Sequence, residues 1–427
     1  MKQYNILWLF SDQHRSQAMG VSGDSNAKTP NLDALANQGM VFENMYTISP
    51  LCAPARASYY TGKYIHQHGV NCLHKPPLHE LKMLPEMLKE VGYQTTHIGK
   101  WHLSGGAAPC HFVSPYFRPG WDTWIGWENS NRPFATEYST GPYPTRKVIE
   151  GYQTDGATDF AIQSIEEMSK KDNPWFLVLS VEPPHDPRVA PEEDMALFEN
   201  MEIAYRPNVP EQWKTPENEK EIRGYYAQIW NLDKNIGRII SKLKELGEYE
   251  NTIIMYFSDH GDFMGSHGKK AKFFAEEESA KIPFIVYHPD MKKRGNTCSD
   301  ITSSLDITKT TLAFAGYQGA EDIYGNDLSQ IVLEGAGKTE GYAIVELDSF
   351  MNDHDDNYCY RAIIDESYVY VKGRKEHNCK LYDRKKDEFQ FQNVLYREEY
   401  REIVKDMHNK LINKLKEIDD PIYKEWE

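Results

Sequence analysis

The sequence predicts an α/β protein with a mostly parallel central sheet flanked by helices and a small C-terminal subdomain with an antiparallel sheet. Two observations predict this architecture. Over the first three quarters of the chain, short apolar runs alternate with longer helical patterns, which is typical of a parallel sheet covered on both faces. Near residue 335 the pattern changes to short strands followed by one charged helix. We therefore expect two domains, residues 1–335 and 336–427.

The elements of the first domain follow from local signals. Strands are short apolar runs, and helices show amphipathic periodicity bounded by proline or glycine, as at Pro30 and Gly247. The predicted strands are Ile6–Phe10, Thr95–Ile98, Trp175–Val181, Thr252–Phe257 and Ile282–Tyr287. One predicted helix starts at Cys52 and continues through Ser58–Gly69. The other predicted helices are Leu32–Gln38, Met83–Val91, Asp155–Lys170, Glu219–Leu246 and Asp306–Phe314.

The second domain is predicted from short strands in meander order and a charged amphipathic helix after them. Its strands are Ala343–Leu347, Arg361–Asp365, Tyr368–Val371 and Lys380–Tyr382, and its helix is Arg397–Ile418.

One stretch of the first domain, Ser104–Thr145, shows no clean period and is rich in glycine, proline and aromatic residues. A loop of this length in a compact domain is usually functional. Its tryptophans, Trp121, Trp124 and Trp127, either offer a surface for stacking sugars or belong to the core.

The composition excludes several classes of protein. The hydrophobic fraction is 40%, the charged fraction is 26% and the net charge is -16, so a nucleic-acid surface or an anionic membrane is not expected as a partner. The six cysteines are scattered without a C-x-x-C pair, which suggests neither a zinc ribbon nor a disulfide scaffold. No leader or bilayer-spanning segment is visible, so we expect a cytoplasmic protein, although a mature secreted form would look similar.

Polar and charged side chains follow four predicted strands at the points where the strands end. Because ligands of open parallel sheets bind outside the carboxyl ends of the strands, these side chains are expected to meet at one edge. The groups are Asp12 with Gln13, Lys100 with His102, His185, and Asp259 with His260.

The acidic pairs at this edge predict a cation site. Asp12, Gln13 and Asp259 offer oxygen and His260 offers nitrogen, a set that suits hard cations such as Ca²⁺ or Mg²⁺. The alternative is that Asp12 and Asp259 only cap the turns that follow them. Because both lie at strand ends beside another candidate ligand, we favour the metal.

A cysteine stands at the start of a predicted helix, where unpaired N–H groups favour an anion. Arg56 follows one turn after Cys52, and Pro54 fits the first helical turn. The candidate residues for an anion site are Arg56, Lys100, His102, His185 and Lys272, although each could be a surface cation. Lys272 is preferred to Lys269 and Lys270 only because of the motif pattern described below.

Several motifs occur in order along the chain. They are Asn5-Ile6-Leu7 leading to Asp12-Gln13, Thr29-Pro30-Asn31-Leu32-Asp33, Cys52-Ala53-Pro54-Ala55-Arg56, Gly92-Tyr93-Gln94-Thr95 with Gly99-Lys100-Trp101-His102, Ser258-Asp259-His260-Gly261, Lys272 ahead of Pro283, and Leu381-Tyr382-Asp383. Together they resemble the type I sulfatase family of the alkaline phosphatase superfamily. The resemblance reaches at least to about residue 320.

The resemblance implies a chemistry for each site residue. Cys52 would be converted to formylglycine by a maturation enzyme, and the hydrated aldehyde would attack sulfur. Asp12, Gln13, Asp259 and His260 would hold one Ca²⁺, which also contacts residue 52. Arg56, Lys100 and Lys272 would bind the sulfate oxygens. His185, alone or together with Lys272, would protonate the leaving alcohol, and His102 would take the proton that lets the aldehyde re-form.

The chain also departs from the usual family pattern. Many members have two adjacent acids where this chain has Asp12-Gln13, asparagine where it has His260, and serine where it has Ala55. The glutamine and histidine also resemble relatives that hydrolyse phosphonate monoesters or phosphodiesters.

The sequence therefore predicts a sulfatase acting on a sulfated carbohydrate, with phosphonate monoester or phosphodiester hydrolysis on the same scaffold as the alternative. Two further hypotheses are less favoured. A two-metal phosphatase would leave Cys52 unexplained, and a binding protein would not need the complete set of polar groups. We expect a small imported saccharide as the substrate rather than a polymer.

Overall fold

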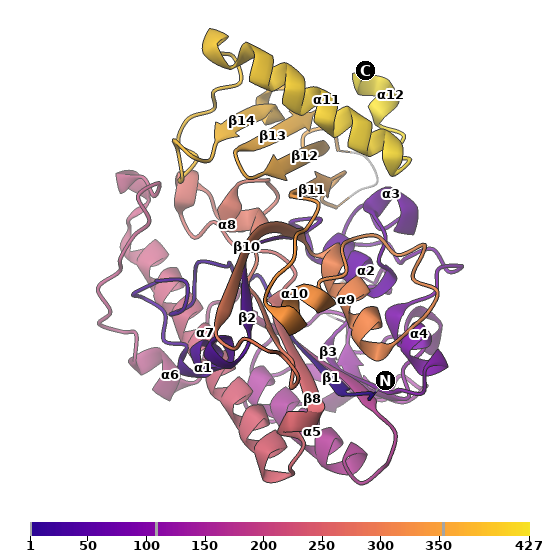
Figure 1. The fold of residues 1–427 in the computed structure, drawn as a ribbon. Helices are drawn as coiled ribbons and strands as arrows, with labels where there is room; N and C mark the ends of the chain where they lie inside the picture. The colour runs from indigo at the N-terminus through magenta and orange to yellow at the C-terminus, as the bar shows by residue number, and fades with distance from the viewer. Residues whose placement is uncertain (1, 107–109, 352–354) are drawn as a thin grey trace.

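The protein has a large α/β domain and a second, smaller sheet, shown in the computed structural model that describes residues 2–106, 110–351 and 355–427 (Figure 1). The strand order of the large sheet is β10-β2-β9-β8-β1-β7-β3-β4-β5-β6. Its strands are β1 (Asn5–Asp12), β2 (Met40–Tyr46), β3 (Gln94–Lys100), β4 (Thr123–Trp127), β5 (Glu137–Thr140), β6 (Lys147–Val148), β7 (Trp175–Pro184), β8 (Thr252–Ser258), β9 (Phe284–Tyr287) and β10 (Asn296–Ser303).

The centre of this sheet is parallel, which confirms the predicted fold class. Strands β8, β1, β7, β3 and β4 run side by side in one direction, whereas β9 and β5 run antiparallel to their neighbours. Every residue of β1 is buried, because helices cover both faces of the sheet. The carboxyl ends of β8, β1, β7 and β3 therefore lie next to one another at one edge.

The helices of the large domain form two layers. Helices α1, α5, α6 and α7 pack on one face, and α2, α4, α9 and α10 pack on the other (Figure 1). The bounds are α1 (Pro30–Gln38), α2 (Cys52–Thr61), α3 (Ile65–His68), α4 (Leu84–Glu90), α5 (Gln153–Met168), α6 (Glu192–Ala196), α7 (Pro216–Glu245), α8 (Glu277–Ala280), α9 (Leu305–Ala315) and α10 (Ser329–Glu334).

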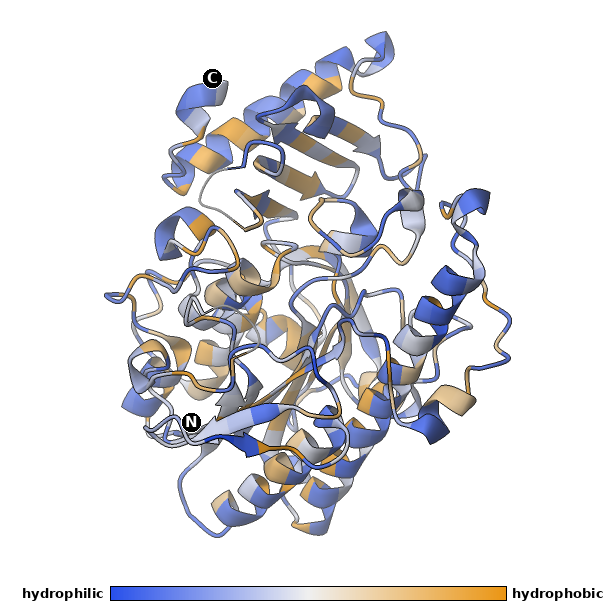
Figure 2. Cartoon of the chain, turned by 180° about the vertical axis from the view of Figure 1, so that it is seen from behind, coloured by the Kyte–Doolittle hydropathy of each residue, from blue (hydrophilic) through white to orange (hydrophobic). Residues whose placement is uncertain are grey.

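The longest helix, α7, shows why these segments fold as predicted. The Thr215 hydroxyl accepts the N–H of Asn218, Pro216 takes the first helical position, and Gly247 follows the end of the helix. Its apolar side is buried while its other side carries charges. Figure 2 shows hydrophobic residues gathered in the central strands and many hydrophilic residues along the outer helices. Across the described residues, no helix combines the length and apolar character needed to cross a membrane.

Two local predictions were wrong. The helix predicted to continue through Ser58–Gly69 stops at Thr61, because Gly62 adopts a left-handed conformation (φ 65°) and its N–H bonds to the carbonyl of Ser58. The stretch Ser104–Thr145, predicted as a loop, contains β4 and β5; residues 107–109 within it lie outside the described part. Strands β2 and β10 were missed because their sequences mix polar and apolar residues without clear alternation.

The tryptophans of that stretch belong to the core rather than to a sugar-binding surface. Trp124 and Trp127 are 4% and 0% exposed. The ring of Trp124 stacks on His97 at 4.6 Å, and Trp121 packs against Phe176 at 5.7 Å. The interpretation as a core cluster is therefore the correct one.

The C-terminal part contains the predicted antiparallel sheet and helix. Alternate residues of each strand point to opposite faces. Ile344 and Ile363 pack beneath α11, whereas Val345 and Ala362 belong to a cluster that includes Tyr46 and Leu51 of the large domain. The elements are β11 (Tyr342–Leu347), β12 (Tyr360–Asp365), β13 (Tyr368–Gly373), β14 (Lys380–Asp383), α11 (Arg401–Glu417) and α12 (Tyr423–Trp426).

A buried cluster of one arginine and three acidic residues lies where this sheet meets the large domain. Arg361 is 2% exposed and pairs with Glu346, Asp348 and Asp420 at 3.0, 2.6 and 2.6 Å. The other oxygen of Glu346 accepts the N–H of Ile65 at the start of α3 at 2.7 Å. The guanidinium thus occupies the position where this acidic cluster would otherwise attract a cation.

Candidate active site

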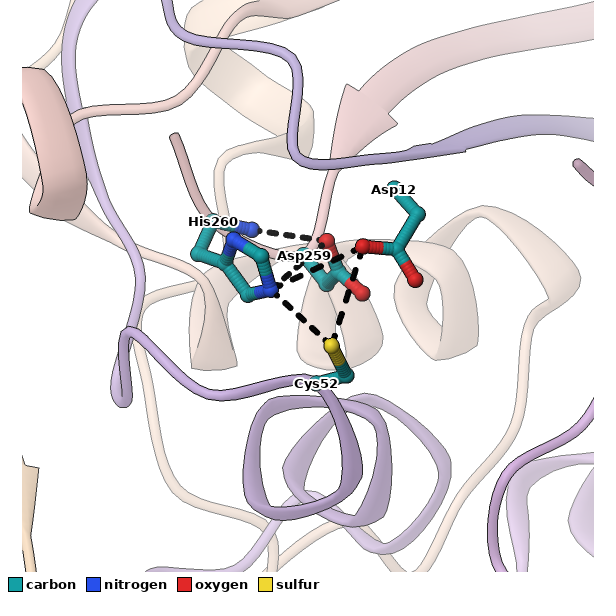
Figure 3. Close-up of side chains that lie close together, drawn as sticks. All are labelled: Asp12, Cys52, Asp259 and His260. Atoms are coloured by element: carbon teal, nitrogen blue, oxygen red, sulfur yellow. Dashed lines mark hydrogen bonds and ion pairs between the residues drawn. The ribbon is translucent and has the colours of Figure 1, made fainter. Parts of the chain in front are cut away.

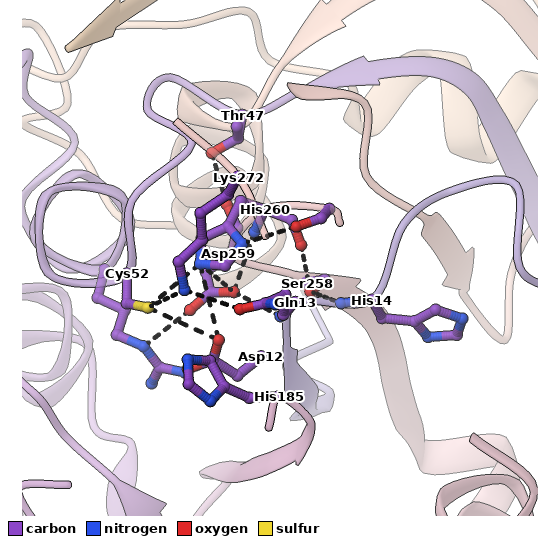
Figure 4. A network of polar contacts seen from close by, with 12 residues as sticks. Asp12, Gln13, His14, Thr47, Cys52, His185, Ser258, Asp259, His260 and Lys272 are labelled. Carbon is purple, nitrogen blue, oxygen red and sulfur yellow. Dashed lines mark hydrogen bonds and ion pairs between the residues drawn. The ribbon is translucent and has the colours of Figure 1, made fainter. Parts of the chain in front are cut away.

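The predicted polar groups meet at the carboxyl edge of the central strands (Figure 4). Asp12 ends β1, Lys100 ends β3, His185 follows β7 and Asp259 follows β8. Cys52 and Arg56 reach the same place from the start of α2, and Lys272 reaches it from the segment after β8. Apart from His185, these side chains are almost completely buried.

Cys52 lies at the centre of this group. Its Sγ lies 3.2 Å from Nε2 of His260, 3.7 Å from Oδ1 of Asp12 and 3.0 Å from Nζ of Lys272. Burial, followed by the charge of Asp12, raises the pKa of the thiol to about 11. Because the thiolate is the nucleophilic form of cysteine, the unmodified side chain is poorly suited to attack a substrate near neutral pH.

A cluster that could hold a cation consists of Asp12, Cys52, Asp259 and His260 (Figure 3). One ligand atom from each residue lies within 4.8 Å of the ligand atoms of the others. Nδ1 of His260 lies 3.0 Å from the carbonyl of Gly261, which fixes the proton there and leaves the Nε2 lone pair facing the carboxylates. Burial lowers the pKa of His260 to about 4, so the ring is neutral at physiological pH. Two carboxylates and a neutral imidazole are a donor set that fits a divalent metal.

Gln13 lies beside this cluster in a left-handed conformation (φ 70°). Its backbone N–H donates to Oδ1 of Asp259 at 3.0 Å, and its side-chain Oε1 accepts from Nζ of Lys272 at 2.8 Å. An amide oxygen has two lone pairs, so Oε1 can accept this hydrogen bond and still face a cation.

Arg56 connects the two acidic residues of the cluster. Its Nε lies 3.1 Å from Oδ2 of Asp259, and its NH2 group lies 3.4 Å from Oδ2 of Asp12. Its NH1 group donates to the hydroxyl of Ser180 at 2.9 Å and to the carbonyl of Lys100 at 3.2 Å. The planar fork of the guanidinium can satisfy all of these acceptors at once, which a lysine cannot do.

The cations around Asp12 determine its charge state. Lys100 donates to Oδ2 of Asp12 at 2.8 Å. Burial alone would raise the pKa of Asp12, but the charges of Lys100, Lys272 and Arg56 together hold that pKa well below its usual value. Asp12 is therefore an anion, and the charge of Asp12 outweighs burial to raise the pKa of Lys100.

Two histidines lie near the cluster and differ in exposure. His102 is buried, has a left-handed backbone (φ 61°), and its Nδ1 has no hydrogen-bond partner among the described residues. Burial and the nearby cations hold its pKa well below the usual value, so the ring is neutral. His185 is partly exposed, and its Nδ1–H donates to the carbonyl of Asp186 at 2.8 Å.

The sequence predictions missed residues behind the cluster. Asp262 accepts hydrogen bonds from the Gln13 side chain and from Arg188. Glu182, at the end of β7, accepts from the indole N–H of Trp127 at 3.1 Å and from the N–H of Ser130 at 2.7 Å. Asp262 could have been noticed because it comes two residues after His260, whereas no local signal indicates the partners of Glu182.

Comparisons with known proteins identify the family of this chain. The family model described as Sulfatase matches residues 4–317, and the model for the C-terminal region of N-sulphoglucosamine sulphohydrolase matches residues 265–417. The ulvan-active sulfatase of Formosa agariphila is 32% identical over 427 residues, covering 97% of this chain and 82% of that protein. The N-acetylglucosamine-6-O-sulfatase of Bacteroides thetaiotaomicron is 28% identical over 418 residues, covering 79% and 72%.

The similarity extends to a solved structure. The crystal structure described as the sulfatase yidJ from Bacteroides fragilis has a TM-score of 0.89 and 27% identity, and the match covers 99% of this chain and 97% of that one. The Sulfatase model alone covers well over half of this sequence. The chain therefore belongs to the sulfatase family and is a hydrolase of sulfuric ester bonds.

Proposed function

We propose that the chain removes sulfate from a sulfated carbohydrate, with a formylglycine made from Cys52 as the nucleophile and one Ca²⁺ as the metal. The observation that supports this most strongly is the position of Cys52, which lies between a cationic Lys272 and the donor atoms of Asp12 and His260. Sulfatases of this family generally use a formylglycine and a divalent metal. The names of the two sulfatase relatives, which refer to ulvan and to N-acetylglucosamine 6-sulfate, support a carbohydrate substrate.

Asp12, Gln13, Asp259 and His260 would hold the metal, and residue 52 would contact it. When bound, the metal would polarise the sulfuryl oxygens, and the hydrated aldehyde would supply the attacking hydroxyl. The raised pKa of the Cys52 thiol is a reason for the modification, because a protonated thiol is a weak nucleophile.

The cationic side chains would bind the transferred group. Lys100 and Lys272 would place ammonium groups near the sulfuryl oxygens, and Arg56 would hold Asp12 and Asp259 in their orientation. All three cations are buried, so water screens their charges only weakly. The site is thus a local basic region in a protein whose net charge is -16.

The two histidines would move protons in opposite directions. His102 would accept a proton from the hydroxyl that remains on residue 52, because its ring is neutral and its Nδ1 has no hydrogen-bond partner among the described residues. His185 would protonate the leaving alcohol from Nε2, since its Nδ1–H is bound to Asp186. Burial and then Lys272 lower the pKa of His185 to about 3, so this role requires the bound ester anion to offset the charge of Lys272.

The first experiment is mass spectrometry of the peptide that contains Cys52, on protein produced with an oxygen-dependent maturation enzyme and, separately, with a radical maturation enzyme. Because Cys52 is 3% exposed, the maturation enzyme must reach it before the chain folds. Formylglycine at this position supports the proposal, and an unmodified cysteine after both treatments contradicts it.

The second experiment compares substrates. Sulfated mono- and disaccharides are tested against phosphonate monoesters and phosphodiesters with the same matured preparation. Higher kcat/KM on a sulfated sugar supports the proposed substrate class. Higher kcat/KM on a phosphonate or phosphodiester would favour the alternative suggested by Gln13 and His260.

A further inference from the structure

The backbone of Gln13, a candidate metal ligand, does not determine which way its side-chain amide points. Its N–H is held by Asp259 at 3.0 Å, and its carbonyl accepts from the hydroxyl of Tyr225 at 3.1 Å. The main chain is therefore fixed, while the side-chain amide could in principle turn by 180° and exchange its oxygen and nitrogen. In one orientation the oxygen faces the cluster, and in the other the N–H groups would face Lys272 and any bound cation.

Asp262 decides between these orientations. It is 1% exposed and lies directly behind the Gln13 amide, whose Nε2 donates to its Oδ2. The reversed amide would bring its oxygen against the carboxylate and its N–H groups against the ammonium of Lys272. Both contacts would be repulsive, so the pair of Asp262 and Lys272 selects the orientation in which Oε1 faces the cluster.

The carboxylate of Asp262 is itself fully occupied. Its Oδ1 accepts the N–H of Met264 at 2.8 Å, and its Oδ2 accepts from both Gln13 and Arg188. Arg188 is 8% exposed and lies over the ring of Tyr225, with 4.9 Å to the centroid. A chain of polar contacts thus runs from Arg188 through Asp262 and Gln13 to Lys272 and ends at Sγ of Cys52.

We propose that Asp262 is a positioning residue that orients the Gln13 amide, so that its oxygen is available to the metal and to Lys272. Outer residues that orient metal ligands typically change metal affinity by about 10- to 100-fold when they are replaced. The inference rests on the metal site of the proposed function, and it adds a residue that does not itself contact metal or substrate.

The test is Asp262→Asn, which keeps the size of the side chain but replaces one acceptor by a donor. If its nitrogen takes the place of Oδ2, it opposes the N–H groups of Gln13 and Arg188; if it takes the place of Oδ1, it opposes the N–H of Met264. We expect the affinity for Ca²⁺, measured by titration calorimetry on the chelator-treated, unmatured protein, to fall by about tenfold.

Asp194→Asn is the matched control, because Asp194 is also 1% exposed and bound to a cation, Lys234, but lies on α6. Its affinity for Ca²⁺ should stay within about twofold of the original chain. Circular dichroism and thermal unfolding of both variants show whether each one folds.

A double variant separates orientation from a structural role. In Asp262→Asn with Gln13→Glu, the nitrogen of residue 262 can donate to a carboxylate at position 13, so an oxygen faces the metal again. We expect the double variant to regain most of the Ca²⁺ affinity lost by Asp262→Asn, without a matching gain in thermal stability.

Each outcome bears on a different statement. If the original chain binds Ca²⁺ and Asp262→Asn binds it equally well, the positioning role is wrong while the metal site stands. If the double variant fails to recover affinity although it folds, Asp262 acts through structure alone and the inference is likewise wrong. If the original chain binds no Ca²⁺, both the metal site and the inference fail.

Discussion

Replacing Arg56 by lysine tests whether the guanidinium fork holds the acidic residues of the site in place. The substitution keeps the positive charge and removes the planar arrangement of donors. Arg56 is completely buried. Its guanidinium pairs with Asp12 and Asp259 and donates hydrogen bonds to the hydroxyl of Ser180 and the carbonyl of Lys100. A lysine ammonium can keep one of the two ion pairs, but it leaves the hydroxyl of Ser180 and the carbonyl of Lys100 without this donor.

The magnitude follows from these lost contacts. A buried acceptor left without a partner costs about 1–3 kcal/mol, so two such acceptors cost about 2–6 kcal/mol in the free energy of unfolding. The contact of the guanidinium with the ring of Phe10, at 4.5 Å, is lost as well. We therefore expect Arg56→Lys to destabilise the protein by about 3 kcal/mol, a large share of the total stability of a typical domain.

Urea unfolding near neutral pH, followed by tryptophan fluorescence, measures this loss. Arg238→Lys is the control, because Arg238 lies on α7, is 44% exposed and pairs with Asp159 at the surface. Its unfolding free energy should change by less than about 0.5 kcal/mol. A loss below about 1 kcal/mol for Arg56→Lys, or equal losses for the two variants, would refute the idea that the fork organises the site.

Three other predictions concern the nucleophile, the metal and pH. Cys52→Ala should abolish sulfate-ester turnover while thermal unfolding changes little, and substantial remaining turnover would contradict the proposed nucleophile. Removal of metal with a chelator should abolish activity and added Ca²⁺ should restore it; unchanged activity after metal removal verified by elemental analysis would exclude the metal site. Burial lowers the pKa of His97 to about 3 in the folded protein, whereas the same side chain has a pKa of about 6.5 in the unfolded chain. Because the unfolded chain binds the proton more readily, the free energy of unfolding falls as the pH drops below 6.5. Between about pH 6.5 and 4.5, the loss of unfolding free energy should be about 2 kcal/mol smaller in His97→Phe than in the original chain. Urea unfolding measures this difference, with His377→Phe at an exposed position as the control. An unchanged pH dependence in His97→Phe would show that His97 does not titrate in this way.

Much of the fold could be predicted because its central elements carry strong local signals. The apolar runs of β1, β7 and β8 are buried on both faces, and α7 has a clear cap, an amphipathic period and a terminating glycine. Weaker signals failed. Strand β10 forms an edge of the sheet and contains several polar residues, so it lacks the apolar run that identifies a central strand.

The candidate site could be predicted in part for a topological reason. Parallel strands place their carboxyl ends on one edge, so residues that follow separate strands, such as Asp12 and Asp259, had to lie near each other. The sequence also indicated Cys52 through its motif at a helix start. It did not indicate that Gln13 binds Lys272, because that contact joins residues 259 positions apart.

The sequence by itself determined the fold class, the family and the identity of the residues that meet at the edge of the sheet. Those properties depend on local periodicity and on motifs, which are short patterns of residues close together in the sequence. Only the tertiary structure decided the charge states of Cys52 and His185. It alone also showed that the tryptophans between Trp121 and Trp127 pack in the core and that Asp262 lies behind Gln13. The physical reason is that pKa values, burial and amide orientation depend on neighbours supplied by distant segments, and these become neighbours only when the chain is folded.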